Sequence, residues 1–288
     1  MNKTFILLFF LPLNLLSQND SISINKNKLN LVYAGTAATL GVSYLFLQNS
    51  WWIDNKSTFH FDDGSDLRYA LNVDKAGHFF GGVLVSDVFQ NSLQWSGVDE
   101  KKSYIYGAVM GTFVQLGIEM KDAYAPNWGF SKWDLISGSF GSLVPLSKRY
   151  LKPMKYIDFK LSYYKKSDQY WIIGEQQKPQ SPPGKYDYHN DYVNQTYWVS
   201  IFPFRDKGHL IGFSLGFGLN DQQFLDSFNT KRGGSNEYYL ALDYDLLQIL
   251  KNWNTPSAKK IKHWLNYFKL PAPTIRISPN IEFFPFFL

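Results

Sequence analysis

Ionisable side chains that could take part in acid–base or metal chemistry recur at helical spacing in three apolar stretches of the chain. Asp74 and His78 lie in the first stretch, Glu119 and Asp122 in the second, and Asp134 in the third. At about 100° per residue, each set forms one narrow stripe of a helix. An unpaired carboxylate among apolar side chains costs several kcal/mol. We therefore expect the three stripes to face one another.

Three kinds of chemistry suit this cluster. His78 paired with Asp74 or Asp134 would act as a general base, with Glu119 and Asp122 as acid or electrostatic stabiliser. One histidine with several carboxylates on facing helices is similar to a carboxylate metal site, although the paired Glu-x-x-His elements of such bundles are absent from the sequence. The same groups with Lys75 would also form a purely structural network. No cofactor is predicted.

Composition excludes several other classes of site. The 288 residues contain no cysteine, so the chain has no disulfide, thiolate zinc site, iron–sulfur cluster, cysteine nucleophile or lipid-modified cysteine. Charged residues make up 18% of the chain, below the roughly 25% of soluble proteins, and aromatic residues another 18%. The net charge of +5 is spread along the chain, which argues against a nucleic-acid partner.

The first residues have the layout of a secretory signal peptide. A short positive start at Lys3 precedes an apolar stretch from Phe5 to Leu16, and the small residue Ser17 follows. The apolar stretch is too short to cross a bilayer. We predict a signal peptide over residues 1–18, and an exported protein of the periplasm or the cell-envelope membrane.

Residues 29–152 read as a bundle of about four apolar helices. The first stretch, Leu29 to Ile53, has no charged residue. It is long enough to span a bilayer and equally suited to a buried core, and both interpretations remain open. The other three helices are expected at Asp74–Trp95, Ser103–Tyr124 and Ser131–Tyr150, with Ser131 as an N-cap.

From Pro153 the period of the apolar residues changes from helical to two. Apolar and polar or small residues then alternate in five segments: 157–163, 196–204, 211–217, 238–244 and 275–283. One basic amphipathic helix is expected at 257–269, where it would lie on a membrane surface or cap the sheet. We therefore predict an α+β fold, with an antiparallel β region over residues 153–288.

Three motifs resemble one known family. The strings D-K-A-G-H-F at Asp74, I-E-M-K-D at Ile118 and G-F-S-K-W-D-L at Gly129 are similar to those of the YfiM-like family of predicted periplasmic lipoproteins, a domain of unknown function. The resemblance covers roughly residues 29–150. A weaker likeness to VanZ-like membrane proteins rests on the D-K-x-x-H start and the later E…S-x-x-D pattern. Neither resemblance implies a reaction.

These features together favour a membrane-associated envelope protein. We expect a structural or partner-binding role, with the membrane lipid surface or an envelope protein as the partner and a buried His/carboxylate network inside. The alternative is a hydrolase or transferase acting on envelope lipid or glycan through the clustered ionisable side chains. That alternative requires His78 and Glu119 to lie within about 10 Å of each other, because proton transfer needs hydrogen-bond reach or one bridging water.

Overall fold

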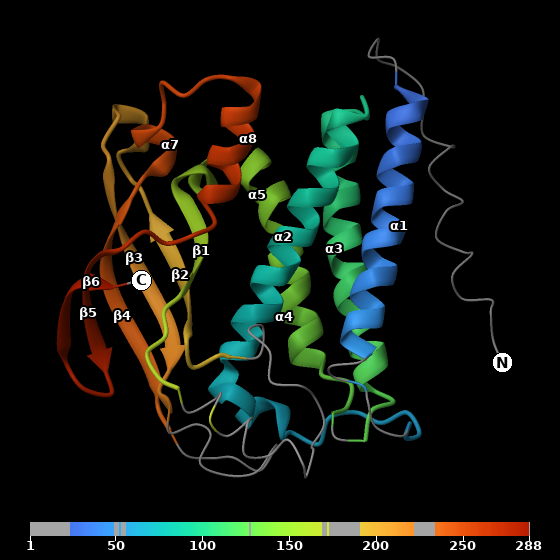
Figure 1. Ribbon diagram of the computed structural model, residues 1–288, viewed down its shortest axis with the longest axis horizontal. Helices are drawn as coiled ribbons and strands as arrows, with labels where there is room; N and C mark the ends of the chain where they lie inside the picture. Colours follow the sequence, from blue (N-terminus) through green and yellow to red (C-terminus); the bar gives the residue numbers. More distant parts are fainter. Residues whose placement is uncertain are drawn as a thin grey trace.

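A computed structural model describes residues 24–48, 52, 56–126, 128–168, 172, 191–221 and 234–287. The predicted signal peptide at 1–18 lies outside these residues. The fold is mixed α+β, as expected, with a helical bundle beside a curled antiparallel sheet (Figure 1).

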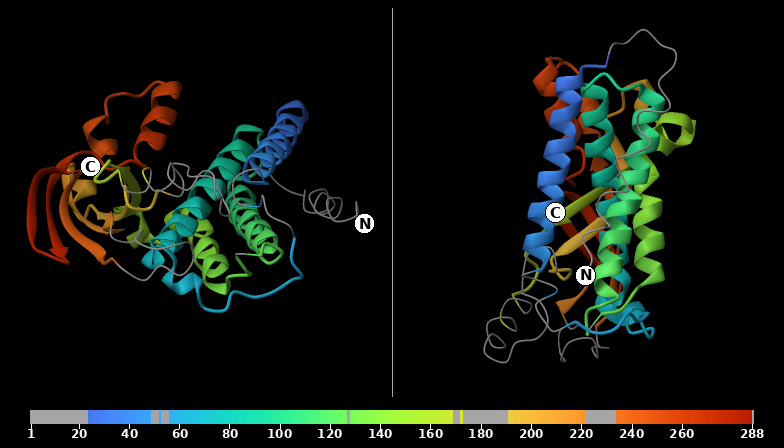
Figure 2. Two further views of the ribbon diagram at one scale, coloured as in Figure 1. Left: turned by 60° about the horizontal axis from the view of Figure 1, so that its bottom comes forward. Right: turned by 90° about the vertical axis from the view of Figure 1, so that its right-hand side faces the viewer.

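The bundle consists of long helices that run nearly parallel or antiparallel to one another (Figure 2). Their bounds are α1 Lys26–Gln48, α2 Val73–Trp95, α3 Glu100–Asp122, α4 Lys132–Ser142 and α5 Val144–Tyr150. The Asp99 and Ser131 side chains accept backbone N–H groups at the starts of α3 and α4. The single helix expected at Ser131–Tyr150 is divided into α4 and α5. Pro145 causes the break, because it has no N–H group and its ring clashes with the carbonyl of the preceding turn.

Glycines let the helix backbones touch. A methyl group on Gly82 would meet the carbonyl oxygen of Gly138, and one on Gly141 would meet that of Phe79. On α3, a methyl group on Gly107 would come within 2.6 Å of the carbonyl oxygen of Ser86. Because α2 lies this close to both α3 and α4, side chains that face inward from the three helices must meet.

The sheet has six antiparallel strands in the order β1-β2-β3-β4-β5-β6. The strands are β1 Ile157–Tyr163, β2 Gln195–Ile201, β3 Ile211–Leu219, β4 Asn236–Tyr244, β5 Ala272–Ser278 and β6 Glu282–Phe287. The expectation of one strand at 275–283 is wrong. Pro279 cannot donate to a strand ladder, and a turn at this point separates β5 from β6.

The sheet curls so that its two edges approach each other. The chain after α8 (Pro256–Leu265) binds the free edge of β1, where the Leu161 N–H donates to the Tyr267 carbonyl at 2.8 Å. Beyond the end of β1, the Tyr164 ring lies 6.0 Å from the Phe287 ring of β6.

Helix α8 is shorter than the predicted 257–269. A short helix, α7 Leu246–Ile249, follows β4.

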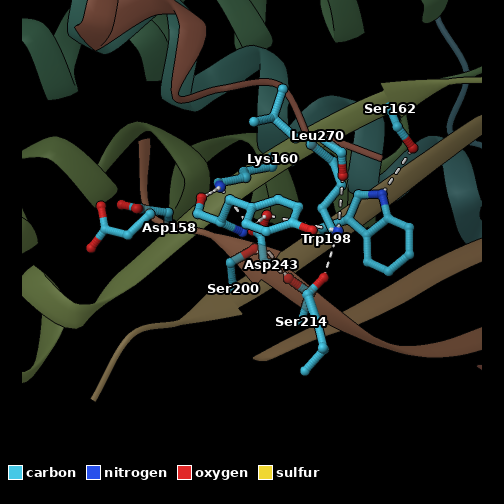
Figure 3. A network of polar contacts seen from close by, with 12 residues as sticks. Asp158, Lys160, Ser162, Trp198, Ser200, Ser214, Asp243 and Leu270 are labelled. Atoms are coloured by element: carbon cyan, nitrogen blue, oxygen red, sulfur yellow. Dashed lines mark hydrogen bonds and ion pairs between the residues drawn. The ribbon is translucent and has the colours of Figure 1, made fainter. Parts of the chain in front are cut away.

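The two faces of the sheet have inverted polarity. On β3, Ile211, Phe213 and Leu215 are each more than half exposed, whereas Ser214 and the neighbouring glycines are buried. The enclosed face carries charges: Lys160 and Asp243, both fully buried, pair at 2.8 Å (Figure 3). Apolar side chains thus point outward over β3, and polar ones point inward.

The first strands of the sheet rest against the bundle. The Phe159 ring of β1 lies 4.9 Å from the Phe79 ring of α2, and the Tyr197 ring of β2 lies 6.0 Å from the Phe80 ring. Helix α2 therefore covers part of the apolar face at β1 and β2, whereas Val199 and Ile201 of β2 and the apolar side chains of β3 are exposed.

Candidate functional site

A cluster of ionisable groups lies where α2 and α4 begin and α3 ends. At its centre the Lys75 ammonium forms ion pairs with three carboxylates. It contacts Asp66 closely, lies 2.9 Å from Asp74 Oδ2 and lies 3.0 Å from Asp134 Oδ1. The side chains of Asp74 and Asp134 are 3% and 7% exposed. One largely buried cation therefore holds together α2, α4 and the 3₁₀ segment Asp66–Asn72 that precedes α2.

Asp66 belongs to this cluster although it lies outside the helices. Burial raises the pKa of its carboxyl group, the nearby Asp134 charge adds to this rise, and the Lys75 ammonium opposes it. The Ser131 hydroxyl donates to Asp66 Oδ2 at 2.5 Å. Ser131 Oγ also accepts the Asp134 backbone N–H at 3.2 Å. The N-cap of α4 is thereby tied to the chain before α2.

The Gln115 side chain orients the His78 ring. Its Nδ1–H donates to the Gln115 side-chain carbonyl oxygen at 2.9 Å, because that oxygen can only accept. Its Nε2 faces Asp134 Oδ2 at 3.8 Å, beyond hydrogen-bond range. With Nδ1 protonated in the neutral ring, Nε2 carries a lone pair near a carboxylate.

Glu119 completes the side of the cluster that faces α3. Its side chain is buried, and Oε2 accepts the Ser131 backbone N–H at 2.9 Å. The other oxygen, Oε1, has no hydrogen-bond partner among the residues that the structure describes. Ligand atoms of His78, Glu119 and Asp134 lie within 4.8 Å of one another. This separation meets the distance condition for the catalytic interpretation.

Asp122 is near enough for its charge to help burial raise the pKa of Glu119, but it is in neither group of clustered ligand atoms. Trp52 Nε1, from the segment after α1, donates to its Oδ1 at 2.5 Å. The side chain thus joins the end of α3 to the chain beyond α1. Of the five candidate residues, the structure brings together Asp74, His78, Glu119 and Asp134 and assigns Asp122 a separate contact.

Sequence reasoning missed a second polar contact in the middle of α2. Asp87 is buried, forms a close ion pair with His263 of α8, and accepts from Gln90 Nε2 at 3.0 Å. It is the one Asp, Glu, Lys or Arg residue between Ala76 and Trp95. A single charged residue in a long apolar helix indicates a buried partner, so the sequence could have predicted this contact.

Comparison with known proteins identifies part of the chain. Residues 61–146 match the family described as predicted periplasmic lipoprotein (DUF2279). The match contains Asp66, the four clustered site residues and Asp122, and it agrees with the expected export to the periplasm or cell envelope. No curated protein and no solved structure matches the chain.

Proposed function

We propose that this member of the cell envelope is embedded in a membrane through its own apolar outer surface, and that it has a structural or partner-binding role there. One observation carries the proposal: in the long helices and in the strands, the charged side chains between the ends are buried or half-buried, while large apolar side chains are exposed. Helix α8, with Lys259 and Lys260 exposed, is the exception.

The helices show this distribution clearly. On α3, residues 103–118 contain no charged side chain, and five apolar side chains are exposed at spacings of three and four: Ile105, Val109, Phe113, Leu116 and Met120. This stripe extends for about 22 Å at 1.5 Å per residue, most of the roughly 30 Å hydrocarbon core of a bilayer.

Helix α1 adds a second apolar surface. Among the described residues it is the one helix long and apolar enough to cross a membrane by length and composition. Val32 is its one buried residue, and Val42 and Leu45 are more than 60% exposed. Helix α4 adds Trp133, Ile136 and Phe140, also exposed. These helices leave apolar surface uncovered that a bilayer would bury.

The sheet continues the apolar surface on the other side of the molecule. Exposed apolar side chains cover its outer face from β3 to β6. Soluble monomers rarely expose apolar patches larger than a few hundred Å². Because apolar faces occur on both α1 and the sheet, at opposite sides in Figure 1, we infer a surrounding lipid phase rather than a single docked protein.

Charged groups mark one end of this apolar surface. Glu100 and Arg149 form an exposed ion pair where α3 begins and α5 ends. Lys155 and Asp206 form another beside the sheet, where the hydrogen bond from Lys155 holds the pKa of the Asp206 carboxyl below its usual value. The family description speaks of lipoproteins, yet this chain has no cysteine to carry a lipid. Its apolar exterior would supply the attachment instead.

Fractionation of the expressed protein tests the proposal. We expect the protein to remain in the membrane pellet after carbonate extraction and to be released by detergent. A charge on the outer face, as in Leu215→Asp, should lower the membrane-integrated fraction. The control Phe204→Asp, at an exposed residue beyond the end of β2, should not. Release of the wild-type protein by carbonate alone would refute membrane embedding.

A catalytic role is the second candidate, favoured by the close approach of His78 and Glu119. In this case His78 would act as general base in hydrolysis or group transfer on envelope lipid or glycan. Incubation of the purified protein with labelled phospholipid or glycan strands would show product release that His78→Gln abolishes. Equal release by wild type and variant would exclude this role for His78.

A further inference from the structure

The cluster contains two groups of ligand atoms that differ in how their charge is balanced. Asp66, Asp74 and Asp134 form one group, and the Lys75 ammonium lies among all three. That group already holds a cation. His78, Glu119 and Asp134 form the second group, in which Asp134 is the one member paired with Lys75.

The second group is arranged as ligands are arranged around a metal ion. A metal-binding histidine usually donates its other ring N–H to a carbonyl or carboxylate oxygen, which orients the ring. Gln115 provides this contact to His78 Nδ1, which leaves Nε2, 3.8 Å from Asp134 Oδ2, as the ring atom that can bind a metal ion. In the neutral ring Nε2 carries a lone pair, and a positive charge between it and the carboxylate oxygen 3.8 Å away would stabilise both.

Glu119 provides an independent observation. Its side chain is 1% exposed, and Oε1 has no hydrogen-bond partner within the described part of the chain. Leaving a buried carboxylate oxygen unpaired is costly. Coordination of a cation together with His78 and Asp134 would satisfy it.

We propose that His78, Glu119 and Asp134 bind a divalent first-row transition-metal ion. Two ligands each about 2.1 Å from an ion lie roughly 3–4 Å apart. The 3.8 Å between His78 Nε2 and Asp134 Oδ2 lies in this range, and all ligand atoms of the group lie within 4.8 Å. An imidazole ligand favours zinc-like ions over Ca²⁺ and Mg²⁺. Gln115 and Lys75 are positioning residues that orient His78 and Asp134. This inference does not depend on membrane embedding.

Metal binding by the detergent-purified full chain tests the site. After removal of metal with a chelator, equilibrium dialysis against Zn²⁺ and elemental analysis should give one ion per chain, with much weaker binding of Ca²⁺. His78→Gln and Glu119→Gln should each weaken Zn²⁺ binding at least tenfold. Gln115→Leu should weaken it by about 10–100-fold. The control His209→Gln, at an exposed loop residue, should bind as wild type does.

X-ray absorption of the wild-type Zn²⁺ complex covers the case in which the variants fail to fold. The proposal predicts scattering from one imidazole among otherwise oxygen ligands. Absence of stoichiometric Zn²⁺ binding to the wild-type chain would overturn the proposal. Wild-type affinity in folded His78→Gln and Glu119→Gln, or a spectrum without an imidazole, would overturn it equally.

Discussion

Replacement of Lys75 by methionine removes the one ammonium group shared by three carboxylates of the cluster. Methionine reproduces the lysine side chain as far as Cε but lacks the ammonium group, so it leaves Asp66, Asp74 and Asp134 without their cation. Removing one partner of a buried ion pair typically costs about 3–5 kcal/mol. This is a large part of the roughly 5–15 kcal/mol that stabilises a typical protein. At about 2–4 °C per kcal/mol, we expect the Tm to fall by about 6–20 °C.

Thermal unfolding in detergent, followed by circular dichroism, measures this change. Lys155→Met is the matched control, because its ion pair with Asp206 is about half exposed and should contribute little. Adding Asp74→Asn to Lys75→Met removes one uncompensated carboxylate, so the double variant should regain part of the lost stability. If Lys75→Met and Lys155→Met unfold at the same temperature, the reasoning about the buried cation is wrong.

Two further changes test the packing and the enclosed face of the sheet. Gly141→Ala should destabilise the protein by about 1–3 kcal/mol, because the added methyl group meets the Phe79 carbonyl; Gly35→Ala on α1, with open space around it, should raise stability by about 0.5–1 kcal/mol. If Gly141→Ala unfolded at a higher temperature than Gly35→Ala, the close packing of α2 and α4 would be contradicted. Lys160→Met should cost about 3–5 kcal/mol by leaving Asp243 buried without its nearest cation, and a wild-type denaturant midpoint would contradict that role.

Much of the fold could be predicted because local periodicity reports local structure. The change from helical period to alternation near Pro153 separates the bundle from the sheet, as observed. Stripes at 100° per residue also identified Asp74, His78, Glu119 and Asp134, since close helix packing forces inward faces to meet. The contribution of Asp66 was beyond such reasoning, because a residue between helices has no face that periodicity can assign.

Alternation predicts strands, but it does not say which face of a strand is enclosed. In water the apolar face would be buried, whereas β3 exposes Phe213 and buries Ser214. The same limit applies to α8, whose predicted apolar face is exposed at Ile261 and Trp264. Which face is enclosed depends on the surrounding solvent and on contacts between distant segments, and neither is encoded in the period.

Because the chain contains no cysteine, single cysteines for site-directed spin labelling can be introduced without any background. Labels at Phe213→Cys, on the outer face of β3, and at Lys207→Cys, in an exposed turn, would be compared in lipid vesicles. Membrane embedding predicts that the label at 213 collides often with oxygen and rarely with a water-soluble nickel chelate, and that the label at 207 does the reverse. Equal exposure of both labels to the nickel chelate would contradict contact between the apolar exterior and lipid.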